Sequence, residues 1–150
     1  MGNKRVVHIV DDEETIRKAL SFTLRTAGFA VEAYASGPEF LLSAEDAEKG
    51  CVVLDMHMPD MDGLQVQAEL TRRGIDMPVV VLTGNGDPTL AVQAMKAGAA
   101  DFLAKPVEKA ALLGAIDRGF SWLESIARRA SEQADALSKA ARMTQRERAV

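Results

Sequence analysis

Polar and charged residues stand directly after four apolar runs of strand length in this sequence. They are Asp11, Asp12, Asp55, Thr83 and Lys105. An acid at the end of a buried strand costs free energy unless it is paired or used. Carboxylates that meet in one crevice repel one another, and protonation, a lysine or a hard divalent cation relieves that repulsion. We therefore expect a Mg²⁺ site with a lysine beside it.

Phosphoryl transfer to a carboxylate would use this whole set of groups. Asp55 would attack the phosphorus, while Mg²⁺ and Lys105 neutralise charge on the transferring group. Thr83 and the backbone N–H of Gly84 would hold its oxygens. Each residue alone also has an ordinary structural interpretation, such as a helix cap, a loop hydroxyl or a solvated charge. Their joint placement at the ends of strands favours the site.

Apolar runs of strand length alternate with segments of helical period along the chain. The predicted strands are Val6–Val10, Ala30–Tyr34, Cys51–Leu54, Val79–Leu82 and Asp101–Ala104. The predicted helices are Glu14–Ala27, Pro38–Leu42, Leu64–Arg73 and Pro88–Ala97. We expect Gly28 and Gly98 to end helices, and Asp87 to cap the helix that begins at Pro88. This alternation predicts an α/β fold with a doubly wound parallel sheet, whose ligand site lies beyond the carboxyl ends of the strands.

Length and composition are typical of one globular domain with a short appendage. The 150 residues are 47% hydrophobic, 27% charged and 5% aromatic, with a formal net charge of −4. No apolar run has the length of a membrane span, and the N-terminal apolar stretch is too short for a signal peptide. The single cysteine, Cys51, cannot form an internal disulfide. We expect a cytoplasmic protein with no membrane association. The net negative charge disfavours direct nucleic-acid binding.

Four separated stretches resemble the receiver domain of bacterial two-component response regulators. They are the Asp11–Asp12 pair, DMHMPDMDG from Asp55 to Gly63, VVLTG from Val80 to Gly84, and AMKAGAADFLAKP from Ala94 to Pro106. Their order and spacing agree with that family over about residues 4–120, and the TGxGD and AMKAGAxDF patterns are similar to the FixJ branch. The resemblance implies a flavodoxin-like five-stranded sheet in the order 2-1-3-4-5.

The resemblance also implies a ligand set for Mg²⁺. Asp55 matches the phosphoacceptor, Asp11 and Asp12 match the metal-binding acids, and the backbone carbonyl of His57 matches a further metal ligand. The His57 ring could instead bind a transition metal, but one histidine among carboxylates is weak support for that interpretation. The neighbouring methionines at 56, 58 and 61 are expected to pack in a loop or core rather than to bind a soft metal.

Further roles follow from the same resemblance. Thr83 matches the switch hydroxyl, Lys105 the phosphate partner, and Phe102 the switch aromatic that turns inward on activation. The Lys105–Pro106 peptide bond is expected to be cis. The side chains of His57 and Asn85 are expected to flank the phosphoryl group.

The C-terminal segment predicts one long helix that continues past the receiver-like region. Its apolar residues are spaced alternately four and three apart, and no proline follows Val107. These residues are Ile116, Phe120, Leu123, Ala127, Ala130, Ala134, Leu137 and Ala141. The seam is rich in alanine, so a helix that pairs two protomers and a single solvated linker helix both remain open.

The last residues, TQRERAV from Thr144 to Val150, predict the start of a new helix. Thr144 and Glu147 have the spacing of a capping box. The stretch resembles the opening of the LuxR-type helix-turn-helix domain of FixJ/NarL-type regulators, and the other interpretation is an ordinary frayed tail. We expect a receiver domain at 1–120, a helical linker or coiled coil at 121–143, and the start of a truncated DNA-binding domain at 144–150.

The resemblance implies a phosphorylation-dependent signalling switch, not an enzyme that turns over a metabolite. A sensor histidine kinase would phosphorylate Asp55, and the change would reposition Thr83, Phe102 and the helix from Pro88. A homodimer would form on phosphorylation or through the C-terminal helix, and DNA would be bound only through the missing domain. The alternative is a Mg²⁺-dependent hydrolase or phosphotransferase with an aspartyl-phosphate intermediate. It would need a substrate pocket, and the chain has no insertion that could form a lid.

Overall fold

A computed structural model of the chain describes residues 5–84 and 88–149, with side chains up to Ser138. Its strands are β1 (Val6–Val10), β2 (Ala30–Tyr34), β3 (Cys51–Asp55), β4 (Val79–Thr83) and β5 (Asp101–Ala104). Its helices are α1 (Glu14–Thr26), α2 (Gly37–Ser43), α3 (Gly63–Arg72), α4 (Pro88–Lys96) and α5 (Lys109–Ala149). The predicted strands and the first four helices are confirmed, and each boundary agrees within one residue.

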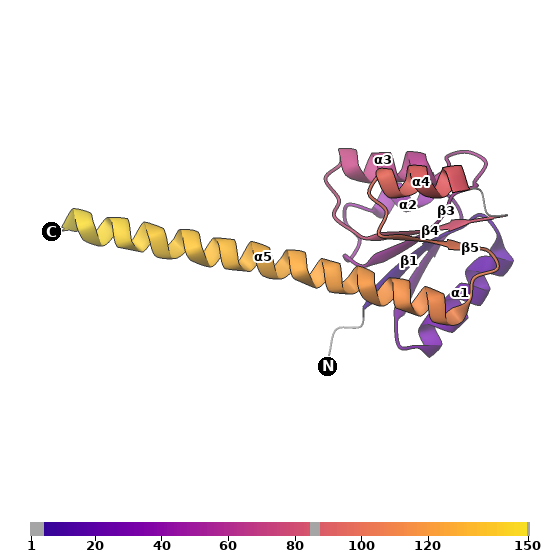
Figure 1. Cartoon of the computed structure of the whole chain (residues 1–150), viewed down its shortest axis with the longest axis horizontal. Coiled ribbons are helices and arrows are strands. Elements are labelled where there is room, and N and C mark those ends of the chain that lie inside the picture. The colour runs from indigo at the N-terminus through magenta and orange to yellow at the C-terminus, as the bar shows by residue number, and fades with distance from the viewer. Residues whose placement is uncertain (1–4, 85–87, 150) are drawn as a thin grey trace.

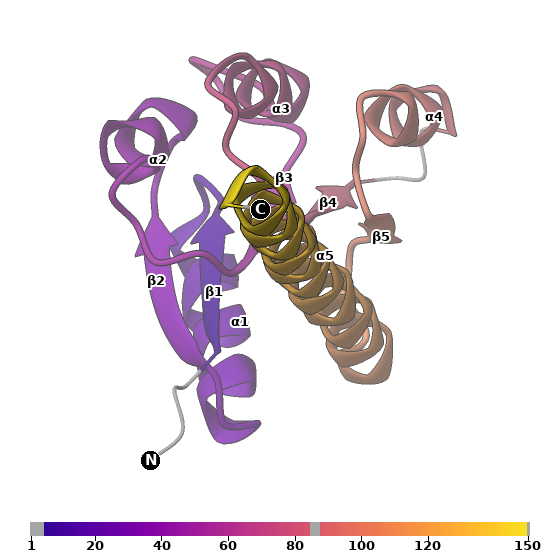
Figure 2. The ribbon, with the colours of Figure 1, turned by 90° about the vertical axis from the view of Figure 1, so that its left-hand side faces the viewer.

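The strands form one parallel sheet in the order β2-β1-β3-β4-β5, which confirms the predicted flavodoxin-like order. Helices α1 and α5 cover one face of the sheet, and α2, α3 and α4 cover the other (Figure 1, Figure 2). All strands point the same way, so their carboxyl ends share one edge. The strand order reverses between β1 and β3, and the crevice at that point is where this topology presents a ligand site.

The central strands are mostly apolar because helices cover them on both faces. Every residue of β1, β3 and β4 is buried, whereas the edge strands β2 and β5 have exposed positions. On the side of α2 to α4 the core includes Phe40, Leu54 and Val66. On the side of α1 and α5 it includes Ile9 and Leu24. A strand without a solvent side shows no alternation in its sequence, which explains the continuous apolar runs.

Local signals mark the ends of several helices. Asp62 and Gln65 form a reciprocal capping box at the start of α3, with both hydrogen bonds at 2.9 Å. Gly28 and Gly98 follow α1 and α4 with φ of 99° and 101°, a region that favours glycine, and this confirms them as helix stops. Asp87, the predicted cap of α4, lies outside the described residues.

Helix α5 has 41 residues and projects far beyond the sheet, which confirms the predicted long helix (Figure 1). Near its start Ile116 and Phe120 are buried, and Phe120 stacks on Phe29 with ring centroids 5.8 Å apart. Farther along the same apolar seam, Leu137 is 72% exposed. Within the described residues, no helix combines the length and apolar character needed to cross a membrane.

The predicted start of a new helix at Thr144 is wrong, because α5 runs without interruption to Ala149. A capping-box spacing is a local signal that needs a break in the preceding helix. Residues 120–143 include neither glycine nor proline, and they are mostly good helix formers. The division of the chain into receiver, linker and DNA-binding segments stays a prediction.

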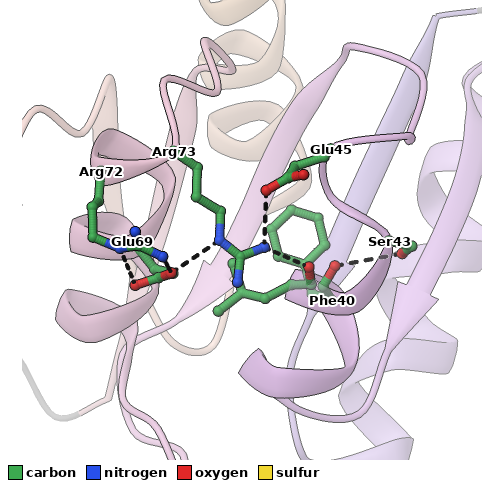
Figure 3. A network of polar contacts seen from close by, with 7 residues as sticks. Phe40, Ser43, Glu45, Glu69, Arg72 and Arg73 are labelled. Carbon is green, nitrogen blue, oxygen red and sulfur yellow. Dashed lines mark hydrogen bonds and ion pairs between the residues drawn. The ribbon is translucent and has the colours of Figure 1, made fainter.

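Arg73, at the end of α3, connects that helix to α2, and Arg72 lies beside it (Figure 3). Arg73 donates to the carbonyl oxygen of Leu41 at 2.8 Å and to the Glu69 carboxylate at 2.9 Å. Its guanidinium also lies 3.6 Å from the Glu45 carboxylate, and Arg72 pairs with Glu69 as well. Hydrogen bonds from Arg72 and Arg73 lower the pKa of Glu69 to about 2. The cation near the last carbonyls of α2 is also favourably placed in the helix dipole.

Candidate functional site

Three carboxylates converge at the carboxyl edge of the sheet. Asp11 and Asp12 follow β1, and Asp55 is the last residue of β3, the strand that pairs with β1. One oxygen from each of the three lies within 4.8 Å of the other two. Asp11 and Asp55 are buried, and Asp12 is exposed. The parallel register thus brings together acids that are far apart in the chain.

Lys105 follows β5 and reaches back to this cluster. Its Nζ lies 3.1 Å from Asp11 Oδ2 and 3.3 Å from Asp55 Oδ1, and its side chain is 18% exposed. One ammonium therefore bridges two buried carboxylates. It relieves part of their mutual repulsion and leaves the cluster with net negative charge.

Backbone N–H groups hold both buried carboxylates in place. Asp55 Oδ1 accepts a hydrogen bond from the His57 N–H at 3.2 Å. Asp11 Oδ1 accepts one from the Glu13 N–H at 2.9 Å. Arg17 donates from its guanidinium to the backbone carbonyl of Asp11 at 2.7 Å. The acids are thus oriented before any ligand binds.

Burial and charge change the pKa values of the cluster. Burial, followed by the neighbouring charge of Asp11, raises the pKa of Asp55 from 3.8 to about 6. The His57 N–H and Lys105 favour the carboxylate and offset part of this rise. For Lys105, burial lowers the pKa, but the hydrogen bond to Asp11 and the charges of Asp55 and Asp11 outweigh it, so its pKa is raised. Lys105 therefore stays protonated, while the contacts of Asp55 do not fully offset the cost of its buried negative charge.

The donor set fits a hard divalent cation. All three candidate ligands are carboxylates, and among the described residues the cluster includes neither a cysteine nor a histidine ring. Asp11 Oδ2 is buried, and its polar contact in the described part of the chain is the Lys105 ammonium. Mg²⁺ binds through one or two carboxylates and completes its octahedron with water and phosphate oxygens. The exposed side of the cluster, at Asp12, is open to such ligands.

The sequence matches a protein family described as "Response regulator receiver domain" over residues 7–117. The chain belongs to this family. The predicted receiver family is therefore confirmed.

Relatives and solved structures of the receiver family agree with this assignment. The transcriptional regulatory protein FixJ of Azorhizobium caulinodans is 40% identical over 144 residues, which are 96% of this chain and 68% of that protein. FixJ of Rhizobium meliloti is 42% identical over 144 residues, with 96% of this chain and 71% of that protein covered. The crystal structure of FixJ-N superposes with a TM-score of 0.75 at 46% identity, covering 79% of this chain and 94% of the other. The structure of the response regulator StyR gives a TM-score of 0.80 at 42% identity, covering 91% and 69%.

Further predicted residues of the receiver lie around the cluster. Thr83 ends β4 and is buried, and its carbonyl accepts a hydrogen bond from the Lys105 N–H at 2.8 Å. Gly84 follows directly and is half-buried. Phe102 on β5 is 44% exposed, so its ring is turned outward in this structure. The Lys105–Pro106 bond is cis, as the resemblance implies.

Other predictions around the receiver site have different outcomes. The His57 side chain is exposed, and the role of its carbonyl as a metal ligand stays a prediction. Met56 and Met58 are buried in the core on the α3 side, in agreement with the packing interpretation. Asn85 lies outside the described residues.

Two residues of this receiver were not predicted. Arg17 carries no distinct signal, because it is one of several basic residues on α1. Gln67 on α3 is buried; its Nε2 donates to the Ala94 carbonyl of α4 at 3.2 Å, and its Oε1 has no partner among the described residues. A signal for Gln67 exists in its spacing, since it shares the buried face with Val66 and Leu70.

Proposed function

We propose that this receiver accepts a phosphoryl group from a sensor histidine kinase on Asp55 in the presence of Mg²⁺, and that phosphorylation controls dimerisation and transcriptional output. The observation that carries the proposal is the buried cluster of Asp11, Asp55 and Lys105 at the carboxyl edge of the sheet. The lysine contacts both carboxylates at 3.1 and 3.3 Å. In a receiver-family chain, this is the group of side chains that phosphoryl transfer needs.

Asp55 is the nucleophile in this proposal. One of its carboxylate oxygens forms a bond to phosphorus as the bond from phosphorus to the leaving atom breaks, and the leaving group takes that electron pair. The leaving atom is an imidazole nitrogen for a kinase phosphohistidine and an acetate oxygen for acetyl phosphate. With a pKa of about 6, Asp55 is mostly ionised at neutral pH, so it can attack without a separate general base.

Lys105 and the acid pair prepare the site for an anionic phosphoryl group. The ammonium that now bridges Asp11 and Asp55 can remain with Asp11 and pair with a phosphoryl oxygen, which offsets the added charge. Asp11, Asp12 and Asp55 would hold Mg²⁺, with the His57 carbonyl as a further ligand. The bound cation supplies positive charge to the oxygens of the transferring group. Thr83 and the Gly84 N–H would hold the remaining oxygens.

The same site gives a route to a conformational change. Thr83 and Phe102 both line an apolar cavity of about 560 Å³ beside α4. In the proposed switch, the Thr83 hydroxyl moves toward the phosphoryl oxygens and leaves space into which the Phe102 ring turns. In this proposal an exposed Phe102 ring, 44% exposed here, belongs to the unphosphorylated state. The surface of α4 and β5 would change with it and alter a dimer or domain contact.

The output side of the proposal rests on the relatives. The FixJ proteins of Azorhizobium caulinodans and Rhizobium meliloti are named transcriptional regulatory proteins. We propose the same kind of output here, with DNA bound through a C-terminal domain beyond α5. Measuring the solution mass with and without BeF₃⁻ and Mg²⁺ tests the dimer, which should form or strengthen when the phosphoryl mimic is present.

Incubation with acetyl phosphate and Mg²⁺, followed by intact-mass analysis, tests phosphorylation itself. We expect one acid-labile phosphoryl group per chain, which Asp55→Asn abolishes. Asp60→Asn is the matched control, because it removes an exposed carboxylate from the same loop and should leave phosphorylation intact. Wild-type protein that stays unmodified with both acetyl phosphate and a cognate kinase would contradict the proposal. Sustained multiple turnover of a small phosphorylated metabolite would favour a hydrolase instead.

A further inference from the structure

Arg17 connects helix α1 to the acidic loop that precedes it. The side chain is half-buried and lies one turn after the start of α1. Its Nη1 donates to the backbone carbonyl of Asp11 at 2.7 Å. This is a charge-assisted hydrogen bond to the peptide that joins Asp11 to Asp12.

The other contacts of this loop hold different parts of it. The Asp11 N–H donates to the Tyr34 carbonyl at 3.2 Å. The Asp11 carboxylate is held by the Glu13 N–H at 2.9 Å and by Lys105 at 3.1 Å. These contacts hold the N–H and the carboxylate of Asp11. None of them holds the carbonyl of the peptide that leads to Asp12. Arg17 holds that peptide by its oxygen.

Asp12 depends on this peptide more than its neighbour does. It is exposed, whereas Asp11 is completely buried. A side chain on the solvent side of a loop takes its direction from the backbone, because no packing surrounds it. The orientation of the Asp11–Asp12 peptide therefore sets the direction in which the Asp12 side chain leaves the backbone.

We propose that Arg17 is a positioning residue that orients the Asp11–Asp12 pair for Mg²⁺. This inference rests on the proposed function of the site. It assigns to Arg17 the role that outer residues have at metal sites: they fix the direction of the ligands, and their loss typically weakens metal binding by about 10- to 100-fold. Arg17 acts on the backbone rather than on a carboxylate, so the lower end of that range is expected.

Charge alone predicts the opposite sign. A guanidinium near the acidic cluster repels an incoming cation, so its removal would tighten Mg²⁺ binding if positioning played no part. Removal of a positioning contact weakens binding. The direction of the change therefore separates the two effects.

Calorimetric titration of the full unphosphorylated chain with Mg²⁺ is the primary test, and three variants are compared with wild type. Arg17→Met removes the charge and the hydrogen bond, and we expect its Mg²⁺ Kd to rise about tenfold. Arg17→Lys keeps the charge and a donor without the fork geometry, and its Kd should lie between those of wild type and Arg17→Met. Arg25→Met is the control: it removes an exposed basic residue from the last turn of α1, and its Kd should stay close to the wild-type value.

The Mg²⁺ dependence of phosphorylation by acetyl phosphate gives a second measurement. Arg17→Met should need about ten times more Mg²⁺ for half-maximal rate, and the rate at saturating Mg²⁺ should return close to wild type. A fold defect would lower the maximal rate at every Mg²⁺ concentration. If Arg17→Met does not fold, Arg17→Lys alone decides, since its Kd must still rise.

An unchanged or lower Kd in the Arg17 variants, with a wild-type protein that binds Mg²⁺ and is phosphorylated, overturns this inference and leaves the proposed function intact. A wild-type protein that neither binds Mg²⁺ nor accepts a phosphoryl group overturns the proposed function first. The two failures are thus distinguishable.

Discussion

At the carboxyl edge of the sheet one lysine contacts two of three clustered carboxylates. Between α2 and α3, in contrast, two arginines both contact the Glu69 carboxylate, and Arg73 also contacts Glu45. Carboxylates outnumber cations in the first network, whereas the second has two carboxylates and two arginines. In the first, burial and negative charge raise the pKa of Asp55 to about 6. In the second, hydrogen bonds from the arginines lower the pKa of Glu69 to about 2.

The proportion of charges decides what each network can do. The network of Glu69, Arg72 and Arg73 already satisfies its carboxylate, so it holds two helices together and has no need of a ligand. The cluster of Asp11, Asp55 and Lys105 has excess negative charge in a buried place, and an added cation lowers its free energy. Excess buried negative charge therefore makes this site ready to bind a cation.

The largest expected effect is on phosphorylation when the lysine is removed. Lys105→Met removes the ammonium that contacts Asp11 and Asp55 and that would pair with the incoming phosphoryl group. We expect the rate with acetyl phosphate at saturating Mg²⁺ to fall by about 10²- to 10³-fold, the usual effect of losing one electrostatic contact to a transition state. Lys109→Met, an exposed lysine at the start of α5, is the control and should keep the wild-type rate. Equal rates in the two variants would remove Lys105 from the mechanism.

A smaller effect is expected on stability when Asp55 becomes neutral. Its pKa in the folded protein, about 6, lies above the ordinary 3.8, so the folded state binds the proton more tightly than the unfolded state. Stability from this group is complete at low pH and is lost as the pH rises from about 4 to about 6. Asp55→Asn cannot ionise at this position, so its free energy of unfolding should not fall over this pH range. At pH 7 it should exceed the wild-type value by on the order of 1–2 kcal/mol, after allowance for screening by solvent at the open side.

Urea unfolding at pH 4, 5, 6 and 7 checks this prediction. EDTA is included because bound Mg²⁺ would neutralise the charge of Asp55 and flatten the dependence of the free energy of unfolding on pH. The groups that face Asp55 are Asp11, Asp12, Lys105 and the His57 N–H, and all are kept in the variant. Parallel pH profiles for the wild-type protein and Asp55→Asn would show that Asp55 is not destabilised in the fold.

In the second network, replacement of Arg73 should lower the stability of the fold, whereas Asp55→Asn should raise it. Arg73→Met loses the hydrogen bonds to Leu41 and Glu69 and leaves the Leu41 carbonyl without this partner. We expect a loss of about 1–2 kcal/mol in the free energy of unfolding, measured by urea, with unchanged Mg²⁺ affinity. A stability equal to wild type would mean that water replaces the guanidinium without cost.

The smallest effect is expected for Arg72→Gln. Its side chain is 70% exposed, and its guanidinium pairs with a carboxylate that Arg73 already contacts. Exposed pairs contribute little because solvent screens them. The Tm should be indistinguishable from wild type, and a Tm drop as large as that of Arg73→Met would show that the two arginines act as one unit.

These two networks also differ in how far they could be predicted from the sequence. Asp11, Asp55, Thr83 and Lys105 each follow an apolar run, and parallel strands end at one edge, so topology alone brings them together. The strands themselves follow from similar reasoning, because burial on both faces imposes continuous apolar runs. Their order in the sheet is implied only by the resemblance to the receiver family.

The network of Arg73 follows no such rule. Its partners Leu41 and Glu45 lie on a different helix and the loop after it, and the chain has many arginines and glutamates that could pair. Which of them meet depends on how α2 and α3 pack against each other, a property of side-chain shape that no spacing encodes. The wrong helix start at Thr144 has a related cause: a capping-box spacing is a short local pattern, and a continuous helix before it overrides that signal.

The length of α5 gives the receiver a lever. Among the seam residues up to Ser138, Phe120, which stacks on Phe29, is the last one that is buried. The helix beyond it is about 40 Å long at 1.5 Å per residue. A tilt of about 10° at that fulcrum would displace the far end by about 7 Å. A rearrangement of atomic size at Asp55 could then reach an attached domain as a movement larger than one helical turn.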